Sequence, residues 1–367
     1  MKTEICIRGA GVVGQVLTLL LARARIRVSL QAAKPTAAKS SDIRSFALNA
    51  ASRQMLIDLR VWPQEATPVQ HMKVWGDQSG HIAFDAQAEP LAWIVDAAAL
   101  QERLTQAMSF ASEVSVVNEA SAQEAALTVI CEGRVSQTRE ATGAAFEQFA
   151  YEQTAIAAHI KCDMSHENTA WQWMDESQVC ALLPRGESQA GNSAALVWSV
   201  SRERAASLQS MNEEEFADAL QEATRNQLGE LQLASECASW PLVLAQAQQW
   251  CGQADWGAWV LAGDAAHAVH PLAGQGLNLG LGDAAELASV LADKPYFRSY
   301  GDMKLLRAYE RARKADAAML RLATDGLQRS FSHPDARVQS LRNWGMKSLD
   351  AASPLKSWLM RQASGVR

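Results

Sequence analysis

The feature that most constrains the fold of this chain is a glycine pattern near its start, Gly9-x-Gly11-x-x-Gly14. An apolar run typical of a short strand precedes the pattern, and an apolar helix and a second strand-like run follow it. In such a unit the first glycine makes the turn, the second lets a pyrophosphate approach the backbone, and the third lets the helix pack on the strand. The pattern therefore predicts a Rossmann-like unit that binds a dinucleotide. Its predicted elements are a strand over residues 5–8, a helix over 15–24 and a strand over 26–30.

A second glycine-rich stretch, residues 259–283, predicts another part of a binding site. Its apolar start is typical of a buried strand that ends in Gly263-Asp264, and a helix is expected from Leu277 onwards. A carboxylate accepts hydrogen bonds from hydroxyl groups, and the free N–H groups of a helix N-terminus attract negative charge. The stretch therefore suits a polyhydroxylated, partly anionic cofactor. An ordinary connection is the alternative, but Pro271 and Gly274-Gln275-Gly276 constrain the backbone more than a connection needs.

The middle of the chain predicts a second sheet of a different kind. Alternating apolar and polar residues are typical of half-buried strands, and residues 69–85 have the pattern of a hairpin. We therefore expect an α/β fold in which a Rossmann-like nucleotide-binding domain is interleaved with an α+β substrate domain built on an antiparallel sheet, plus C-terminal helices. The predicted boundaries are 1–68, 96–148 and 250–330 for the nucleotide-binding domain, 69–95 and 149–249 for the substrate domain, and 331–367 for a C-terminal helical tail.

Charge and cysteine content exclude several classes of protein. The net charge of −6 disfavours nucleic-acid binding, which usually needs a basic excess. The six cysteines show no C-x-x-C pair and no metal-ligand spacing, so we expect free thiols in a reducing compartment and no metal site. No apolar run reaches the roughly 18 residues of a membrane span, and no signal-peptide pattern is present. The expected location is the cytoplasm.

The last part of the chain has a basic bias that allows two interpretations. Between Arg337 and Arg367 the only acidic residue is Asp350. Such an amphipathic segment can lie on an anionic membrane surface, which would place the protein peripherally on the inner face of the membrane. A packed C-terminal helix with a solvated basic face explains the same pattern.

Two polar residues near the first motif are further candidates for cofactor contacts. The second strand of a dinucleotide-binding unit normally ends in an acidic residue that holds the adenosine ribose, and here that position is Gln31. An amide can still hydrogen-bond a hydroxyl group. Arg44 is predicted at a helix start, where a positive charge opposes the helix dipole. It is therefore either a ligand for a phosphate or a ring, or a solvated surface arginine.

Taken together, the motifs resemble those of the FAD-dependent aromatic hydroxylases of the para-hydroxybenzoate hydroxylase type. The resemblance rests on the first glycine pattern, on Glu132-Gly133-x-x-Ser136-x-x-Arg139 and on the Gly263-Asp264 stretch with its proline–glycine loop. It is closest to the branch that hydroxylates the ring of ubiquinone precursors. That closer likeness extends from end to end of the chain and is carried by Asp42-x-Arg44-x-x-Ala47-Leu48, His270-Pro271-Leu272-Ala273-Gly274-Gln275-Gly276-Leu277-Asn278-Leu279-Gly280 and Tyr309-Glu310-Arg311-x-Arg313.

The resemblance implies an FAD-dependent monooxygenase that hydroxylates an electron-rich aromatic ring, such as a ubiquinone-precursor phenol, with O2. It implies a flavin C4a-hydroperoxide as oxygen donor and NAD(P)H, bound transiently, as reductant. Because the flavin carries the chemistry, no catalytic side chain is assigned, and His270 and Pro271 are expected near the flavin. Asp264 would hold the ribityl chain. The residues implied in FAD binding are Gly9, Gly11, Val13, Gly14, Gln31, Arg44, Glu132, Asp264, Pro271, Gly274, Gly276, Leu277 and Asn278.

Two other functions stay open. One is a flavoprotein reductase or dehydrogenase acting on a hydrophobic substrate. The other is an FAD-poor homologue that serves as a binding or scaffold subunit, motivated by Gln31 and by Glu132, where the family has Asp. A homodimer and a place in a biosynthetic complex are both compatible with the sequence. The apolar sheet residues that are either substrate-pocket walls or ordinary core are Trp173, Val179, Leu182 and Trp198.

Overall fold

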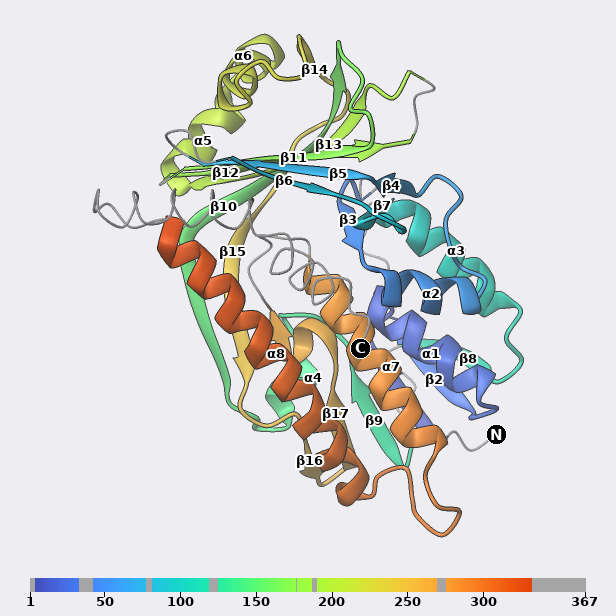
Figure 1. Ribbon diagram of the computed structural model, residues 1–367. Helices are drawn as coiled ribbons and strands as arrows, with labels where there is room; N and C mark the ends of the chain where they lie inside the picture. Colours follow the sequence, from blue (N-terminus) through green and yellow to red (C-terminus); the bar gives the residue numbers. More distant parts are fainter. Residues whose placement is uncertain are drawn as a thin grey trace.

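The computed structural model describes residues 4–32, 42–76, 81–118, 125–175, 177–186, 190–268 and 275–331. In these ranges the chain forms a lower body around a mostly parallel sheet, an upper body on a large mostly antiparallel sheet, and a small three-stranded sheet between them (Figure 1). The α/β fold class predicted from the sequence, with one parallel and one antiparallel sheet, is confirmed.

The parallel sheet lies at the centre of the lower body. Its strand order is β16-β17-β9-β1-β2-β8, and β1 pairs in parallel with both β2 and β9. Parallel strands are buried on both faces, which is why β1 and β9 are almost entirely apolar. The strands are β1 (Ile5–Arg8), β2 (Val28–Ala32), β8 (Val114–Asn118), β9 (Leu127–Ile130), β16 (Cys251–Ala254) and β17 (Gly257–Leu261).

Helices cover this sheet and contact one another. Helix α1 packs against α3 and α7, and α7 packs against the long helix α8 (Figure 1). A short helix, α4, follows β9. The bounds are α1 (Val12–Arg23), α3 (Ala97–Ser109), α4 (Gln137–Ala141), α7 (Gln275–Ala292) and α8 (Met303–Phe331). Among the described helices, none combines the length and the apolar character that crossing a bilayer requires.

The large sheet forms the upper body, and its two long strands, β10 and β15, run down beside the lower body (Figure 1). Helices α5 (Arg202–Ser210) and α6 (Glu213–Ala223) lie on its outer face. Its last strand, β18, comes from the segment directly after Asp264. The strands are β5 (His71–Trp75), β6 (His81–Asp85), β10 (Phe146–Cys162), β11 (Thr169–Met174), β12 (Val179–Arg185), β13 (Ser193–Ser201), β14 (Leu231–Leu233), β15 (Ala238–Ala247) and β18 (His267–Ala268).

The small sheet joins the two bodies. Its strands are β3 (Ser45–Leu48), β7 (Ala92–Asp96) and β4 (Thr67–Val69), in the order β3-β7-β4. Helix α2 (Ala50–Asp58) follows β3, and the side chain of Asn49 caps it by accepting a hydrogen bond from Ser52 N. The small sheet therefore fixes the segment that carries Arg44 between the two bodies.

Two local predictions were wrong. The second strand is Val28–Ala32 rather than 26–30, because Arg25 adopts a left-handed conformation (φ 58°) and Ile26 N bonds back to Leu21 O to end α1. Arg44 does not start a helix. It precedes β3, whose Ser45 pairs with Asp96 of β7. The position of Arg44 at a helix N-terminus therefore cannot be used as a reason for a role in ligand binding.

Candidate active site

The first glycine turn packs directly on the strand that carries the middle motif. Gly9 has φ 107°, and a Cβ atom there would overlap the backbone of Cys131, the last residue before Glu132. A Cβ atom on Gly14 would overlap the carbonyl of Gly9. Only glycine fits both positions. The turn is therefore held tight against β9 and α1, as the fingerprint predicts.

Gly11 has a different environment, because a Cβ atom there would meet nothing within 4 Å. Gly11 is the N-cap of α1, and no side chain accepts a hydrogen bond from the first turn of that helix. Unpaired N–H groups at a helix N-terminus, beside open space, are suited to a phosphate. These residues therefore fit the pyrophosphate of a dinucleotide.

Val13 connects the first motif with the late one. A Cβ atom on Gly280 of α7 would lie 2.8 Å from Val13 Cγ2, and one on Gly263 would lie 3.3 Å from the Val13 methyl groups. The two glycines thus make room for this valine. Packing of α1 on α7 brings the N-terminal glycine turn next to the Gly263-Asp264 turn, about 250 residues away in sequence.

Asp264 occupies the short 3-10 turn at the end of β17. Its side chain is exposed, yet desolvation by the surrounding protein raises the pKa of its carboxyl group, opposed by the nearby charges of His267, Arg134 and Arg44. Solvent therefore reaches this carboxylate although protein atoms surround it closely. This carboxylate is suited to accept hydrogen bonds from ligand hydroxyl groups.

A buried ionic network supports the Asp264 turn from behind. Asp283 of α7 is fully buried and accepts hydrogen bonds from Gly263 N (2.9 Å) and Arg313 Nε (2.7 Å), while His267 Nε2 lies 2.6 Å from its Oδ2. Burial opposes ionisation of Asp283, but His267 and Arg313 outweigh it and lower the pKa of its carboxyl group. Sequence reasoning did not predict this role for Asp283. The pattern that could have predicted it is an acidic residue on the apolar side of the helix α7.

Glu132 is engaged by the protein itself. Its carboxylate accepts hydrogen bonds from Ser136 Oγ (2.6 Å) and Thr138 Oγ1 (2.7 Å) and pairs with Arg8 Nε (3.1 Å). Burial opposes ionisation, but these donors and Arg8 lower the pKa of Glu132. The carboxylate therefore braces the start of α4. The backbone N of Glu132 is adjacent to Gly9, so this brace lies beside the first glycine turn.

Arg139 links the middle motif to the late one. It is buried, and its guanidinium donates to the carbonyl oxygens of Ala265 (3.3 Å) and Arg134 (2.8 Å). It also lies 3.5 Å from the centre of the Phe146 ring. Because Ala265 follows Asp264, Arg139 fixes the turn that presents this carboxylate.

The other predicted cofactor residues lie around these motifs. Asn278 accepts from Asn49 N and Ser52 Oγ and donates to Ala47 O, so its amide ties α7 to the β3–α2 junction. Gly276 and Leu277 are half-buried in the first turn of α7. Gln31 is buried near the end of β2, and Arg44 is half-exposed, paired with Asp42 at 2.6 Å. His270, Pro271 and Gly274 lie outside the described residues.

The large sheet presents its two faces to different parts of the molecule. Trp173, Leu182 and Trp198 pack in the core under α5 and α6, so they are sheet core and not pocket walls. Val179 is half-buried beside Met174. The opposite face, directed at the small sheet, carries small and polar side chains together with larger apolar ones such as Leu183 and Val197. Its positions on β10, β12 and β13 include Ala157, His159, Ala181, Arg185, Ala195 and Ser199.

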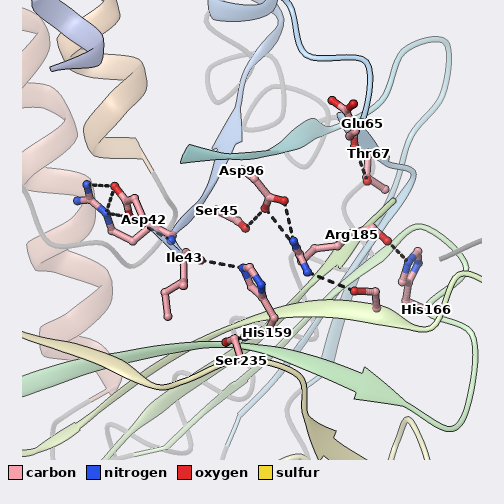
Figure 2. Close-up of polar contacts among 12 residues, drawn as sticks. Asp42, Ile43, Ser45, Glu65, Thr67, Asp96, His159, His166, Arg185 and Ser235 are labelled. Carbon is pink, nitrogen blue, oxygen red and sulfur yellow. Dashed lines mark hydrogen bonds and ion pairs between the residues drawn. The ribbon is translucent and has the colours of Figure 1, made fainter. Parts of the chain in front are cut away.

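A layer of polar contacts joins this inner face to the small sheet (Figure 2). Arg185 of β12 pairs with Asp96 at 2.7 Å, and Asp96 accepts a hydrogen bond of 2.5 Å from Ser45 Oγ. Burial opposes ionisation of Asp96, but Arg185 and Ser45 lower the pKa of its carboxyl group. His159 Nε2 lies 3.0 Å from the carbonyl oxygen of Ile43. The inner face is therefore anchored next to the segment that carries Arg44.

Comparisons with known proteins agree with this arrangement. The FAD binding domain family matches residues 106–322, more than half of the chain. The 3-demethoxyubiquinol 3-hydroxylase of Escherichia coli (strain K12) is 28% identical over 395 aligned positions, covering 99% of each chain. The mitochondrial ubiquinone biosynthesis monooxygenase COQ6 of Mus musculus is 33% identical over 283 positions, covering 68% of this chain and 58% of that protein.

Solved structures show the same fold. The p-nitrophenol 4-monooxygenase PnpA from Pseudomonas putida DLL-E4 superposes with a TM-score of 0.78 at 16% identity, covering all of both chains. PqsL from Pseudomonas aeruginosa, a probable FAD-dependent monooxygenase by its description, superposes with a TM-score of 0.74 at 19% identity. The glycine turn, the Asp264 turn and these matches agree, and the chain belongs to the FAD binding domain family as an FAD-dependent monooxygenase.

Proposed function

We propose that this protein hydroxylates the ring of a hydrophobic, electron-rich phenol, a ubiquinone precursor, with FAD, O2 and NAD(P)H. The observation that carries the proposal is the convergence of three distant motifs: Gly9 on Cys131, Val13 on Gly263, and Arg139 on Ala265. Relatives that match over nearly the whole chain are ubiquinone hydroxylases by name, which supports the substrate class.

The residues that would hold FAD divide by the chemistry of its parts. Gly11 and the first turn of α1 offer N–H groups to the pyrophosphate. Asp264 offers acceptors to the ribityl hydroxyl groups, and Gln31 an amide to the adenosine ribose. Gly276 and Leu277, in the first turn of α7, would place the positive end of that helix beside the ring system. Arg44 would lie beside the pyrophosphate or the ring.

Bound FAD would supply the oxygen-transfer chemistry, and the protein would supply position and electrostatics. The α7 dipole would stabilise negative charge near its N-terminus by about 0.3–1 kcal/mol. The inner face of the large sheet would orient the phenol, because the outer face is filled by the aromatic core packed under α5 and α6.

The domain assignment follows from these roles. Residues 1–68, 96–148 and 250–330 would form the FAD-binding domain, and 69–95 with 149–249 the substrate domain. NAD(P)H would bind transiently, since the sequence has one dinucleotide fingerprint. The basic segment 332–367 lies outside the described residues, and its contact with a membrane surface stays a prediction.

The purified protein tests this function. It should be yellow and release FAD on denaturation. With NADH or NADPH, O2 and a hydrophobic phenol, it should yield a product heavier by one oxygen atom. Protein that is colourless and cannot be reconstituted with FAD would favour a scaffold role, and flavin reduction without oxygen incorporation would favour a reductase.

A further inference from the structure

His159 lies on β10, on the inner face of the large sheet, and points toward the segment that precedes β3 (Figure 2). We infer that Nδ1 of His159 accepts the proton of the substrate's phenolic hydroxyl group. This inference rests on the proposed hydroxylation of a phenol. The aromatic ring would then react as a phenolate.

The hydrogen bond of the other ring nitrogen fixes the tautomer of His159. Nε2 lies 3.0 Å from the carbonyl oxygen of Ile43. A carbonyl oxygen only accepts hydrogen bonds, so Nε2 carries the proton. In the neutral ring Nδ1 is then the unprotonated nitrogen, and it has no hydrogen-bond partner among the described residues. Its lone pair is available to a ligand.

The backbone of His159 is held by the chain beside it, and its imidazole by the contact with Ile43. The backbone N–H of His159 donates to Ser235 Oγ at 2.8 Å, and its carbonyl oxygen accepts a hydrogen bond from Ala234 N. Its partner on β13 is Ala195. On the same face of β10, Ala157 is the neighbour on one side of His159 and Lys161 the neighbour on the other. A fixed base beside small side chains can receive a planar ring.

His159 is tied to the cofactor side of the molecule through one carbonyl group. Ile43, which accepts from Nε2, directly precedes Arg44. Arg44 and Asp264 interact electrostatically, and Asp264 is the carboxylate of the late motif. A phenol bound at Nδ1 would therefore lie beside the segment that reaches the proposed FAD site.

Charged groups from several elements surround the imidazole. Asp96, at the end of β7, interacts electrostatically with His159 and is paired with Arg185 of β12. Asp42 and Arg44 form a second ion pair next to Ile43.

The proton transfer balances without a further reactant. The phenolic O–H bond breaks, the proton bonds to Nδ1, and the electron pair stays on the phenolate oxygen. That charge raises the electron density at the ring carbons ortho and para to the oxygen, where an electrophilic oxygen atom reacts. The imidazolium later returns the proton to the product or to water.

Ionisation of bound 4-nitrophenol tests the assignment, because its phenolate is yellow and its phenol is colourless. Difference spectra of the FAD-loaded protein, with and without the probe, give the pH midpoint of bound probe. In the wild type this midpoint should lie below that of free 4-nitrophenol. His159→Gln keeps an N–H donor for Ile43 but has no basic nitrogen. It should raise the midpoint by about one to three pH units, the effect of losing one nearby opposite charge.

His71→Gln is the matched control, since His71 is an exposed histidine on β5 of the same sheet. The pH midpoint of 4-nitrophenol bound to this variant should equal that of the probe bound to the wild type. Equal midpoints in wild type and His159→Gln would overturn the role of His159. FAD content and oxygenated product are measured on the same preparations. A wild type that holds FAD and hydroxylates phenols without shifting the probe overturns only the His159 assignment, whereas a wild type without FAD or product overturns the proposed function.

Discussion

At the scale of single residues, Asp264 and Asp283 show how position decides what a carboxylate does. Desolvation without a close partner raises the pKa of Asp264. A carboxylate in this environment is typical of a ligand-binding site. Asp283, on α7 behind the turn, contacts His267 and Arg313, and these contacts outweigh its burial and lower the pKa of its carboxyl group. The first group is suited to binding and the second to holding the turn in place.

Asp264→Asn should have opposite effects on cofactor binding and on the apoprotein. Hydrogen bonds to a charged group contribute about 1.5–3 kcal/mol, so FAD should bind about tenfold to a hundredfold more weakly. The folded state disfavours the ionised Asp264, so removing its charge should raise the melting temperature of the apoprotein at neutral pH. That gain should vanish in acid, where the carboxyl is protonated anyway. FAD titration and calorimetry measure both, with exposed Glu140→Ala as control. Wild-type FAD affinity in Asp264→Asn would contradict the assignment.

Asp283→Asn should destabilise the whole fold, because it removes the buried counter-charge of Arg313 and leaves this arginine only its pair with the part-exposed Asp316. Breaking a buried pair costs about 3–5 kcal/mol. The pKa of Asp283 is lowered by folding, so its stabilisation is present above the ordinary carboxyl pKa and is lost as pH falls through the folded value. Wild type and variant should therefore converge in acid. Urea unfolding from neutral to acidic pH checks this, with the exposed Asp85→Asn as control. A difference that stays constant with pH would refute the charge argument.

At the scale of elements, the chain order of strands and helices was predictable where the local pattern was strong. The β1–α1 unit, the hairpin of β5 and β6 and the strands of the large sheet all follow apolar periodicity. The start of α1 was placed three residues too late, and the start of β2 two residues too early, since the left-handed Arg25 between them leaves no compositional mark. The face of a sheet that meets the other body depends on tertiary packing, which is why Trp173 and Trp198 could not be separated from pocket residues in advance.

Gly11→Ala and Gly14→Ala should separate the binding role of the glycine turn from its packing role. Gly11 has an extended backbone and open space for a methyl group, so the apoprotein should keep its stability while FAD binding weakens. A methyl group on Gly14 would overlap Gly9, so stability should fall by about 1–3 kcal/mol, as in other overpacked sites. Thermal unfolding of both apoproteins and FAD titration distinguish them. Equal loss of apoprotein stability in the two variants would refute the distinction.

At the scale of the whole molecule, the sequence predicted which motifs meet, but not what holds them. The likeness to a known family placed Gly9, Glu132 and Asp264 at one site, and the packing of Gly9 and Val13 explains how they approach. The supports behind them come from residues far apart in the chain, such as Asp283 with Arg313 and Asp96 with Arg185. A buried pair of this kind leaves no pattern in the local sequence, because each charged residue by itself is expected to lie on the surface.

The Asp96–Arg185 pair gives the last prediction, since it joins the large sheet to the small one. Arg185 is 4% exposed and Asp96 24%, so Arg185→Met should cost about 3 kcal/mol, the lower end for a broken buried pair. If the pair also fixes the inner sheet face against the segment of Ile43 and Arg44, the variant should bind phenols more weakly while keeping FAD. Combining it with Asp96→Asn should restore part of the stability, because the carboxylate is no longer left unpaired. Urea unfolding of the single and double variants, with FAD and 4-nitrophenol titrations, tests this coupling. Additive losses in the double variant would show that the two side chains act independently.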